Sequence, residues 1–177
     1  MPTEKISFIN LLELEEMARG HLAQGSFDYI AGAADDEVSH RNNRADYDRI
    51  KLRPRYMIDV SNIDTTTTVL GTPISLPVMF APTAGHKLCC PEGEKATARA
   101  AHAAGTAMIL STLSTTSMED VAAASNGPKW FQLYVYKDRE ITRQLVQRAE
   151  AAGYKALCLT VDVPVIGNRE RDLRNAF

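Results

Sequence analysis

Four short apolar runs in this chain each end in residues with polar side chains or an accessible backbone. Together these residues could bind one ligand. They are Ala81, Pro82, Thr83 and Ala84 after the first run, Ser111 after the second, Gln132 and Tyr134 in the third, and Thr160 and Asp162 after the fourth. Hydroxyls, a carboxamide and accessible backbone suit a flat heterocycle with carbonyl and ring-nitrogen edges better than they suit a metal. A single Ser or Thr at such a place could equally cap the next helix. Four sites in register favour a flavin.

The apolar runs alternate with helical segments, which predicts parallel β-α units. The first helix is alanine-rich and runs from about Pro91 to Ala104, with Gly105 as its stop. Ser117, with Asp120 three residues later, opens the next helix, and Asp138 is a good N-cap for a third. Strands and helices that alternate through short loops form right-handed parallel units, so a shared edge would collect the polar side chains.

Four β-α units amount to half of an eight-stranded barrel. The fold class we predict is α/β, specifically the first half of a TIM (β/α)8 barrel. An open doubly wound sheet is the competing architecture, but the glycine-rich nucleotide signatures of such sheets are missing. We expect an N-terminal helical segment over residues 1–64, opened by Asn10 with Glu13, a β-hairpin over 65–76 that plugs the barrel floor, and the half-barrel over 77–177.

Composition excludes several other classes of protein. Hydrophobic residues make up 45% and charged residues 24% of the 177, which is ordinary for a globular domain. A net charge of −2 favours neither nucleic acid nor acidic lipid as a partner, and no apolar run approaches a membrane span. The start of the chain lacks a secretory signal, so we expect a cytoplasmic protein. His86 with the adjacent Cys89 and Cys90 makes a poor zinc set, and we predict no metal.

Several short segments of the chain together carry a resemblance to a known family. They are Phe27-Asp28-Tyr29, Ala81-Pro82-Thr83-Ala84, Pro91-Glu92-Gly93-Glu94, Phe131-Gln132-Leu133-Tyr134 with Lys137-Asp138-Arg139, and Leu159-Thr160-Val161-Asp162 through Arg169. In these segments the chain resembles the FMN-dependent 2-hydroxy acid oxidases, which include glycolate oxidase and L-lactate oxidase. The resemblance covers nearly the whole chain in order.

The resemblance implies FMN as cofactor and a role for each matching position. The backbone of Ala81 to Ala84 would lie along the flavin ring, and Ser111, Gln132 and Thr160 would hydrogen-bond its polar edge. Tyr29 would bind the substrate carboxylate, and Tyr134 would hydrogen-bond near the substrate hydroxyl. From the residues alone, both tyrosines also read as amphipathic core residues.

The resemblance also implies that Asp162 orients a catalytic histidine, which none of the four histidines present matches. Arg169 would supply positive charge for the carboxylate or the flavin. Glu170, Arg171, Asp172 and Arg174 read instead as a solvated mixed-charge face. We expect the family's barrel to continue beyond a cut in the loop after the fourth strand. Four further units would carry the histidine base, an active-site lysine, a second arginine and the FMN phosphate site.

Leu113 departs from the aromatic residue that glycolate oxidases carry there, which favours lactate or a longer acid over glycolate. The function expected is therefore the N-terminal half of an L-2-hydroxy acid oxidase with oxygen as acceptor. It would be active with a C-terminal half-barrel chain and would form a homo-oligomer, of the tetramer class in the family. The alternative is an inactive half-barrel that serves as a folding or assembly unit through self-association. A phosphate-binding synthase or aldolase would need a lysine at a strand end, and none is placed there. A peroxisomal signal could lie beyond this chain.

Overall fold

The computed structural model describes residues 7–162 and 164–177, so the parts of the predicted segments at residues 1–6 and 163 lie outside it. Its elements fall into two compact units. Unit 1 combines residues up to Arg55 with Val165–Phe177, and unit 2 is Tyr56–Pro164. The predicted half-barrel over 77–177 differs from this division, because residues from Val165 onward group with the N-terminal helices and not with the strands.

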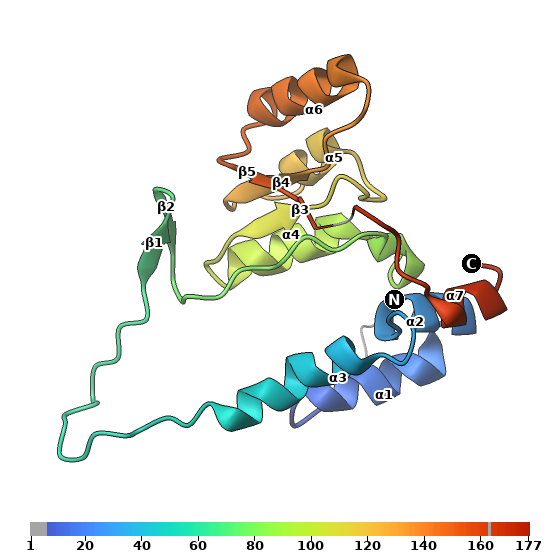
Figure 1. Cartoon of the computed structure of the whole chain (residues 1–177). Coiled ribbons are helices and arrows are strands. Elements are labelled where there is room, and N and C mark those ends of the chain that lie inside the picture. Colours follow the sequence, from blue (N-terminus) through green and yellow to red (C-terminus); the bar gives the residue numbers. More distant parts are fainter. Residues whose placement is uncertain (1–6, 163) are drawn as a thin grey trace. The chain divides into compact units, whose positions relative to one another are not determined.

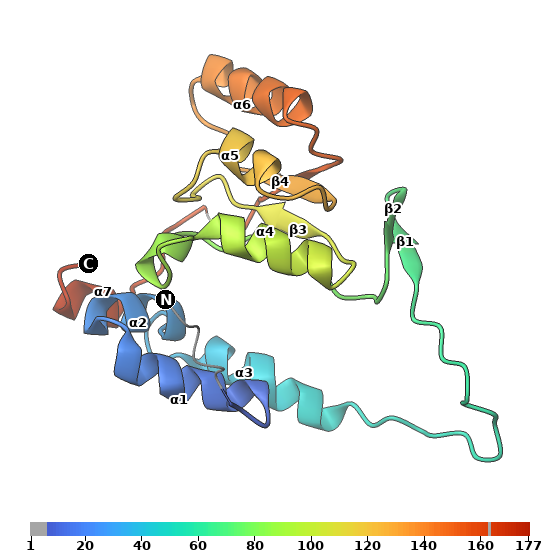
Figure 2. The same ribbon diagram turned by 180° about the vertical axis from the view of Figure 1, so that it is seen from behind.

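Unit 2 contains a parallel sheet whose strand order follows the sequence. Its strands are β3 (Met108–Leu110), β4 (Lys129–Leu133) and β5 (Leu157–Leu159), with β4 in the middle. Leu110 lies opposite Phe131, and Phe131 lies opposite Leu157. Three helices lie along one side of the sheet (Figures 1 and 2). Along the chain, α4 (Glu94–Ala103) precedes β3, α5 (Met118–Ala123) lies between β3 and β4, and α6 (Arg139–Ala151) lies between β4 and β5. This β-α alternation is the predicted one.

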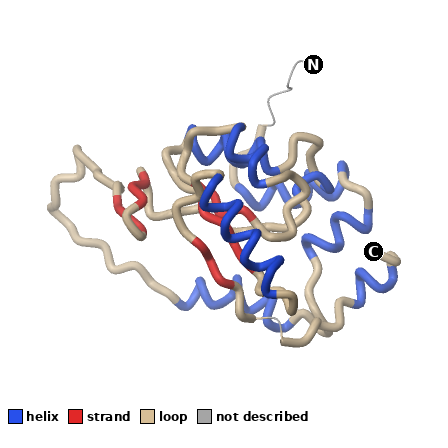
Figure 3. Tube along the Cα trace, turned by 90° about the horizontal axis from the view of Figure 1, so that it is seen from above, coloured by secondary structure: helices blue, strands red, loops and turns tan. Residues whose placement is uncertain are grey.

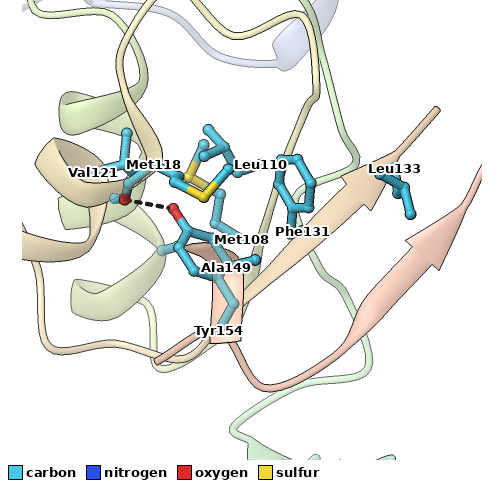
Figure 4. Close-up of a cluster of buried hydrophobic side chains, with 10 residues drawn as sticks. Met108, Leu110, Met118, Val121, Phe131, Leu133, Ala149 and Tyr154 are labelled. Carbon is cyan, nitrogen blue, oxygen red and sulfur yellow. Dashed lines mark hydrogen bonds between the residues drawn. The ribbon is translucent and has the colours of Figure 1, made fainter. Parts of the chain in front are cut away.

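The helices and strands of unit 2 enclose one hydrophobic core, drawn in Figure 4. Alternate strand residues point at the helices, since side chains in a strand alternate between its two faces. Phe131 packs edge-on against Tyr154, with ring centroids 6.2 Å apart. The Tyr154 hydroxyl donates to the carbonyl oxygen of Met118 at 3.0 Å. The core members are Ala98, Ala101, Met108, Leu110, Met118, Val121, Phe131, Leu133, Ala149 and Tyr154.

Local sequence signals account for the helix boundaries of unit 2. The side chain of Ser117 accepts from the backbone N–H of Asp120, and that of Asp138 accepts from Glu140. Gly105 and Gly153 follow α4 and α6 with φ of +67° and +83°, a backbone conformation that glycine adopts at little cost. These caps and stops are the predicted ones, because they depend only on neighbours in sequence.

The predicted hairpin is present as β1 (Thr67–Val69) paired antiparallel with β2 (Thr72–Ile74). It contacts the amino-terminal ends of the sheet strands. The indole N–H of Trp130 donates to the Thr72 hydroxyl at 3.2 Å, and the Ser75 N–H donates to the Gly105 carbonyl at 2.8 Å. Ile74 is buried beside them. The hairpin therefore covers the floor of the sheet, opposite the edge where the polar residues gather.

The first predicted strand, residues 78–81, is much shorter than expected. It forms one parallel bridge, Phe80 with Met108, next to β3. The Phe80 N–H donates to the Ala107 carbonyl, and the Ile109 N–H donates to the Phe80 carbonyl, both at 3.0 Å. After it, η2 (His86–Leu88) is a short 3-10 turn in the loop that leads to α4. Because the bridge is parallel, the residues after Phe80 leave the sheet at the same edge as the residues after β3.

Unit 1 is helical and contains α1 (Leu11–His21), α2 (Gln24–Ala31), α3 (Val38–Ala45), the 3-10 turn η1 (Asp46–Arg49) and α7 (Glu170–Arg174). Figure 3 distinguishes these helices from the connecting loops. Asn10 caps α1 as predicted, since its side chain accepts from Leu12 and Glu13. Phe27 is buried, with the Arg19 guanidinium 4.4 Å from its ring centroid. The stacking of Arg19 on Phe27 joins α1 to α2.

Candidate functional site

Three of the predicted flavin-contacting residues form one hydrogen-bonded row at the carboxyl ends of β3, β4 and β5. The Gln132 side chain is at its centre and is only 2% exposed. Its carbonyl Oε1 accepts from the Ser111 hydroxyl at 3.2 Å, and its Nε2 donates to the Thr160 hydroxyl at 2.8 Å. The three side chains come from successive strands and share the face that points away from the helices. The structure thus brings Ser111, Gln132 and Thr160 together as the parallel order predicts.

Thr112 belongs to the same row, although it is not among the predicted site residues. Its N–H donates to Gln132 Oε1 at 3.0 Å, and its hydroxyl donates to the Gln132 carbonyl. The Tyr134 N–H donates back to that hydroxyl at 3.1 Å. Thr112 therefore fixes the exit of β3 against the exit of β4. Its position directly after Ser111 is the only sequence signal that could have found it.

The loop carrying Ala81, Pro82, Thr83 and Ala84 follows the Phe80 bridge and lies beside the loop after β3. The Gly85 N–H donates to the Leu113 carbonyl at 3.3 Å, and the Leu113 N–H donates to the Ser111 hydroxyl at 3.1 Å. Gly85 has a φ of +70°, which lets the chain turn sharply there. The Leu113 side chain is 53% exposed. The two loops thus flank the polar row within unit 2.

A buried carboxylate, Glu94 at the start of α4, connects these two loops. Its side chain is fully buried and accepts hydrogen bonds from the Thr115 N–H at 2.7 Å, the Thr116 hydroxyl at 2.7 Å and the His86 N–H at 3.3 Å. Burial by itself raises the pKa of the Glu94 carboxyl, but the hydrogen bonds from Thr116 and Thr115 outweigh it and lower the pKa to about 2. Glu94 is therefore ionised at neutral pH.

The remaining predicted site residues of unit 2 are more open. Tyr134 is half-buried just past β4, and Asp162 is exposed two residues after Thr160. Asp162 follows β5, so it lies beyond the same carboxyl edge of the sheet as the polar row.

Tyr29 and Arg169 are placed together in unit 1. The Arg169 guanidinium lies 5.2 Å from the Tyr29 ring centroid and donates to the backbone carbonyls of Tyr29 and Gly32. Its Nε donates to the Asp172 carboxylate at 2.5 Å. The Tyr29 ring also stacks on Phe177, with centroids 4.9 Å apart. Tyr29, expected to bind the substrate carboxylate, and Arg169, expected to supply positive charge for that carboxylate or for the flavin, are thus neighbours.

The charged residues after Arg169 are only partly the solvated face that the sequence predicts. Glu170 and Arg174 pair with each other at 2.6 Å on an exposed surface, as expected. Arg171 instead pairs with Glu37 at 2.8 Å, and Asp172 is half-buried against Arg169. The prediction was wrong for Arg171 because its partner Glu37 is distant in sequence, and for Asp172 because charge balance does not show that a carboxylate is mostly buried.

Neither a metal centre nor a membrane span is found in the described part of the chain. Over residues 7–162 and 164–177, no group of three or more His, Cys, Asp or Glu side chains could hold a metal ion. The Nδ1 of His86 is 3.1 Å from the Thr97 hydroxyl, and Cys89 and Cys90 are exposed. Over the same residues, no helix combines the length and the apolar character that a bilayer crossing requires.

Known proteins similar to this chain include named oxidases. L-lactate oxidase from Nostoc sp. strain PCC 7120 is 58% identical over 173 residues, which cover 96% of this chain and 47% of that protein. Glycolate oxidase from Spinacia oleracea is 54% identical over 168 residues, 95% of this chain and 46% of that protein. The chain therefore spans about half the length of the curated relatives it matches.

Solved structures agree in fold. The crystal structure of a mandelate oxidase superposes with a TM-score of 0.93 at 42% identity, over 97% of this chain and 50% of that one. A putative lactate oxidase from Pediococcus acidilactici superposes with a TM-score of 0.94 at 39% identity, over 98% of this chain and 49% of that one. The fold is a partial α/β barrel, as predicted. A family model described as FMN-dependent dehydrogenase matches residues 18–177, so the chain belongs to the FMN-dependent dehydrogenase family.

Proposed function

We propose that this chain forms the first half of an FMN-dependent oxidase that converts an L-2-hydroxy acid to the 2-oxo acid. The observation that carries the proposal is the row of Ser111, Gln132 and Thr160 at the carboxyl edge of the sheet. Relatives at 54–58% identity are named lactate and glycolate oxidases, and the chain matches about half of each. The remaining half would come from a C-terminal half-barrel.

The row fits the polar edge of a flavin. The Thr160 hydroxyl accepts from Gln132 and so retains its own proton for a ring carbonyl or ring nitrogen. The Gln132 carboxamide has two N–H donors and uses one of them on Thr160 in the described part of the chain. Because the donors are held by a buried network, they need little reorganisation to bind the ring. The loop from Ala81 to Ala84 would lie along the ring itself.

Bound FMN would supply the acceptor for the two electrons that leave the α-carbon of the acid. Around it, the chain's own residues would bind and orient the substrate. Arg169 has five N–H donors and in the described structure uses three of them on Asp172, Gly32 and Tyr29. Its positive charge would serve the substrate carboxylate or the flavin. Tyr29 would bind the same carboxylate, and Tyr134 would hydrogen-bond near the substrate hydroxyl. Asp162 would orient a histidine base contributed from outside this chain.

Finer features of the proposal rest on single residues or on composition. Leu113 leaves more room than an aromatic side chain would, which favours lactate over glycolate. Oxygen is the proposed acceptor and a homo-oligomer the proposed assembly. Three cysteines, two of them adjacent, are a poor disulfide framework and support a cytoplasmic location.

An inactive half-barrel that assembles with copies of itself is a second candidate, because β5 has an apolar face. Leu157 is 45% exposed and Leu159 55% exposed on the side of the sheet that the helices cover elsewhere. Exposed strand edges with apolar side chains tend to pair. Addition of the other half separates the two candidates, since self-assembly predicts an oligomer of the chain that yields no flavin oxidase when the other half is supplied, whereas the main proposal predicts an active flavin complex.

The experiment that tests the main proposal is complementation. The chain is mixed or co-expressed with the C-terminal half of the Nostoc L-lactate oxidase, the region that the chain does not match. We expect the complex to bind FMN and the flavin to be reduced by L-lactate, whereas the chain alone does neither. Flavin reduction by the chain alone would contradict the need for a second half. Failure of the complex to bind FMN would refute the catalytic assignment.

A further inference from the structure

We propose that Glu94 is a positioning residue for the flavin, because its buried carboxylate sets the spacing of the two loops that flank the flavin ring. The inference rests on the proposed function, since it assigns a flavin site to these loops. Glu94 would touch neither flavin nor substrate. It would act through the loop of residues 81–88, which follows the Phe80 bridge, and the loop of residues 111–117, which follows β3.

The contacts of Glu94 are divided between the two loops. Oε1 accepts from the His86 N–H in the first loop and from the Thr115 N–H in the second. Oε2 accepts from the Thr116 hydroxyl at 2.7 Å. The Thr115 hydroxyl donates to the carboxylate at 2.9 Å and accepts from the Lys87 N–H at 3.1 Å, so it extends the connection back to the first loop. One side chain therefore fixes both loops.

Two bonds join the loops directly, without Glu94. The Lys87 N–H donates to the Thr115 hydroxyl at 3.1 Å, and the Gly85 N–H donates to the Leu113 carbonyl at 3.3 Å. The carboxylate adds bonds from the Thr115 N–H and the Thr116 hydroxyl at 2.7 Å and from the His86 N–H at 3.3 Å, and hydrogen bonds to an ionised acceptor are about twice as strong as neutral ones. Removal of Glu94 would thus release the charge-assisted connection and leave the two neutral bonds.

The residue before Glu94 shows that the packing here is close. Gly93 has a φ of +53°, and a Cβ added to it would lie 2.9 Å from Lys87 Cγ and 3.3 Å from the Thr116 hydroxyl oxygen. Both loops therefore press on the start of α4, and only glycine leaves space for them. The ionised carboxylate lies in this crowded place without a basic side chain bonded to it in the described structure, so its negative charge is balanced by N–H and O–H donors alone.

Loop spacing matters for a flavin because the two loops carry different contacts. Ala81 to Ala84 would lie along the ring, whereas Ser111 hydrogen-bonds in the polar row and Leu113 lies just beyond it. A shift of one loop against the other would separate ring and edge contacts. Misplacement by about 1 Å is enough to lose much of the benefit of a preorganised site.

The test uses the FMN-loaded complex of this chain with the C-terminal half, in four variants. Glu94→Ala removes all acceptors. Glu94→Gln keeps the shape and one acceptor oxygen, while its amide can donate to the Thr hydroxyls, which rotate freely. Glu92→Ala removes an exposed carboxylate two residues away that pairs with Arg99. Ala98→Gly weakens α4 at a buried core position that gives no hydrogen bond to the Glu94 carboxylate in the described structure.

The measurements are the FMN dissociation constant, the visible spectrum of the bound flavin, and kcat and KM for L-lactate, all below the unfolding temperature. We expect Glu94→Ala to weaken FMN binding at least tenfold, to shift the flavin spectrum and to lower kcat more than it raises KM. Glu94→Gln should recover most of the binding. Glu92→Ala and Ala98→Gly should leave the dissociation constant and the spectrum unchanged, even though Ala98→Gly lowers stability.

The outcomes separate three explanations. If Glu94→Ala loses stability as Ala98→Gly does but keeps the FMN constant and spectrum, Glu94 is merely structural and the proposal is overturned. If Glu94→Gln is as impaired as Glu94→Ala, hydrogen-bonded spacing is not the cause and the proposal is likewise overturned. If the unaltered complex binds no FMN, the proposed function itself fails. That result differs from one in which the unaltered complex and the Glu94→Ala complex bind FMN equally well, which would overturn only the role of Glu94.

Discussion

Replacement of Gln132 by Met should destabilise the sheet measurably, because Gln132 is the centre of the polar row. Met keeps the unbranched shape of the side chain but removes three side-chain hydrogen bonds, those with Ser111, Thr112 and Thr160. Each such bond contributes about 0.5–1.5 kcal/mol net, and a buried donor left without an acceptor costs about 1–3 kcal/mol. We therefore expect the free energy of unfolding to fall by about 2–4 kcal/mol, which for a chain of this size lowers the melting temperature by roughly 4–16 °C.

The assay is urea unfolding at pH 7, followed by the fluorescence of Trp130, the only tryptophan, which is buried at the amino end of β4. Gln144→Met is the matched control. Gln144 is exposed on α6 and bonds only to Glu140 in the described structure, so its replacement should change stability by less than about 0.5 kcal/mol. Equal losses in the two variants, or no loss in Gln132→Met, would refute the conclusion that the polar row holds the strand ends together.

Three further changes have defined outcomes. Tyr154→Phe removes the buried hydrogen bond to Met118 and should cost about 0.5–1.5 kcal/mol in urea unfolding, with an unchanged dependence on urea concentration; a loss of several kcal/mol would mean that the ring itself is displaced. The folded pKa of Glu94 lies at about 2, below its ordinary 4.5, so its contribution to stability is complete above pH 4.5 and declines as pH falls toward 2. Acid unfolding should therefore be shallower in Glu94→Gln, and identical acid curves would contradict the lowered pKa. Leu113→Phe in the FMN-loaded complex should shift the ratio of kcat/KM for glycolate over lactate upward by about tenfold, and an unchanged ratio would remove Leu113 from the substrate pocket.

Much of the half-barrel could be predicted because its signals are local. Ser117 and Asp138 cap their helices through contacts two or three residues away. The parallel order of β3, β4 and β5 follows from short loops and right-handed crossovers, so Ser111, Gln132 and Thr160 had to meet at one edge.

The remaining features depend on contacts that sequence does not display. Glu94 reads as an ordinary first-turn acid of a helix, and its burial becomes visible only when residues 21 and 22 positions further on fold over it. Thr112 reads as one more loop hydroxyl. The run at 78–81 predicts a full strand, but its N–H and carbonyl groups find partners in β3 only around Phe80. Arg171 reads as solvated because its partner Glu37 is 134 residues away.

The most direct test of the central claim is a titration of FMN into the complex of this chain with the C-terminal half of the Nostoc L-lactate oxidase, followed by anaerobic addition of L-lactate. We expect saturable FMN binding and bleaching of the flavin absorbance by lactate. We also expect Gln132→Met and Glu94→Ala to weaken FMN binding and Glu92→Ala to leave it unchanged. A folded complex of the two halves that binds no FMN, or binds it equally well in all these variants, would contradict the flavin site assigned to Ser111, Gln132 and Thr160.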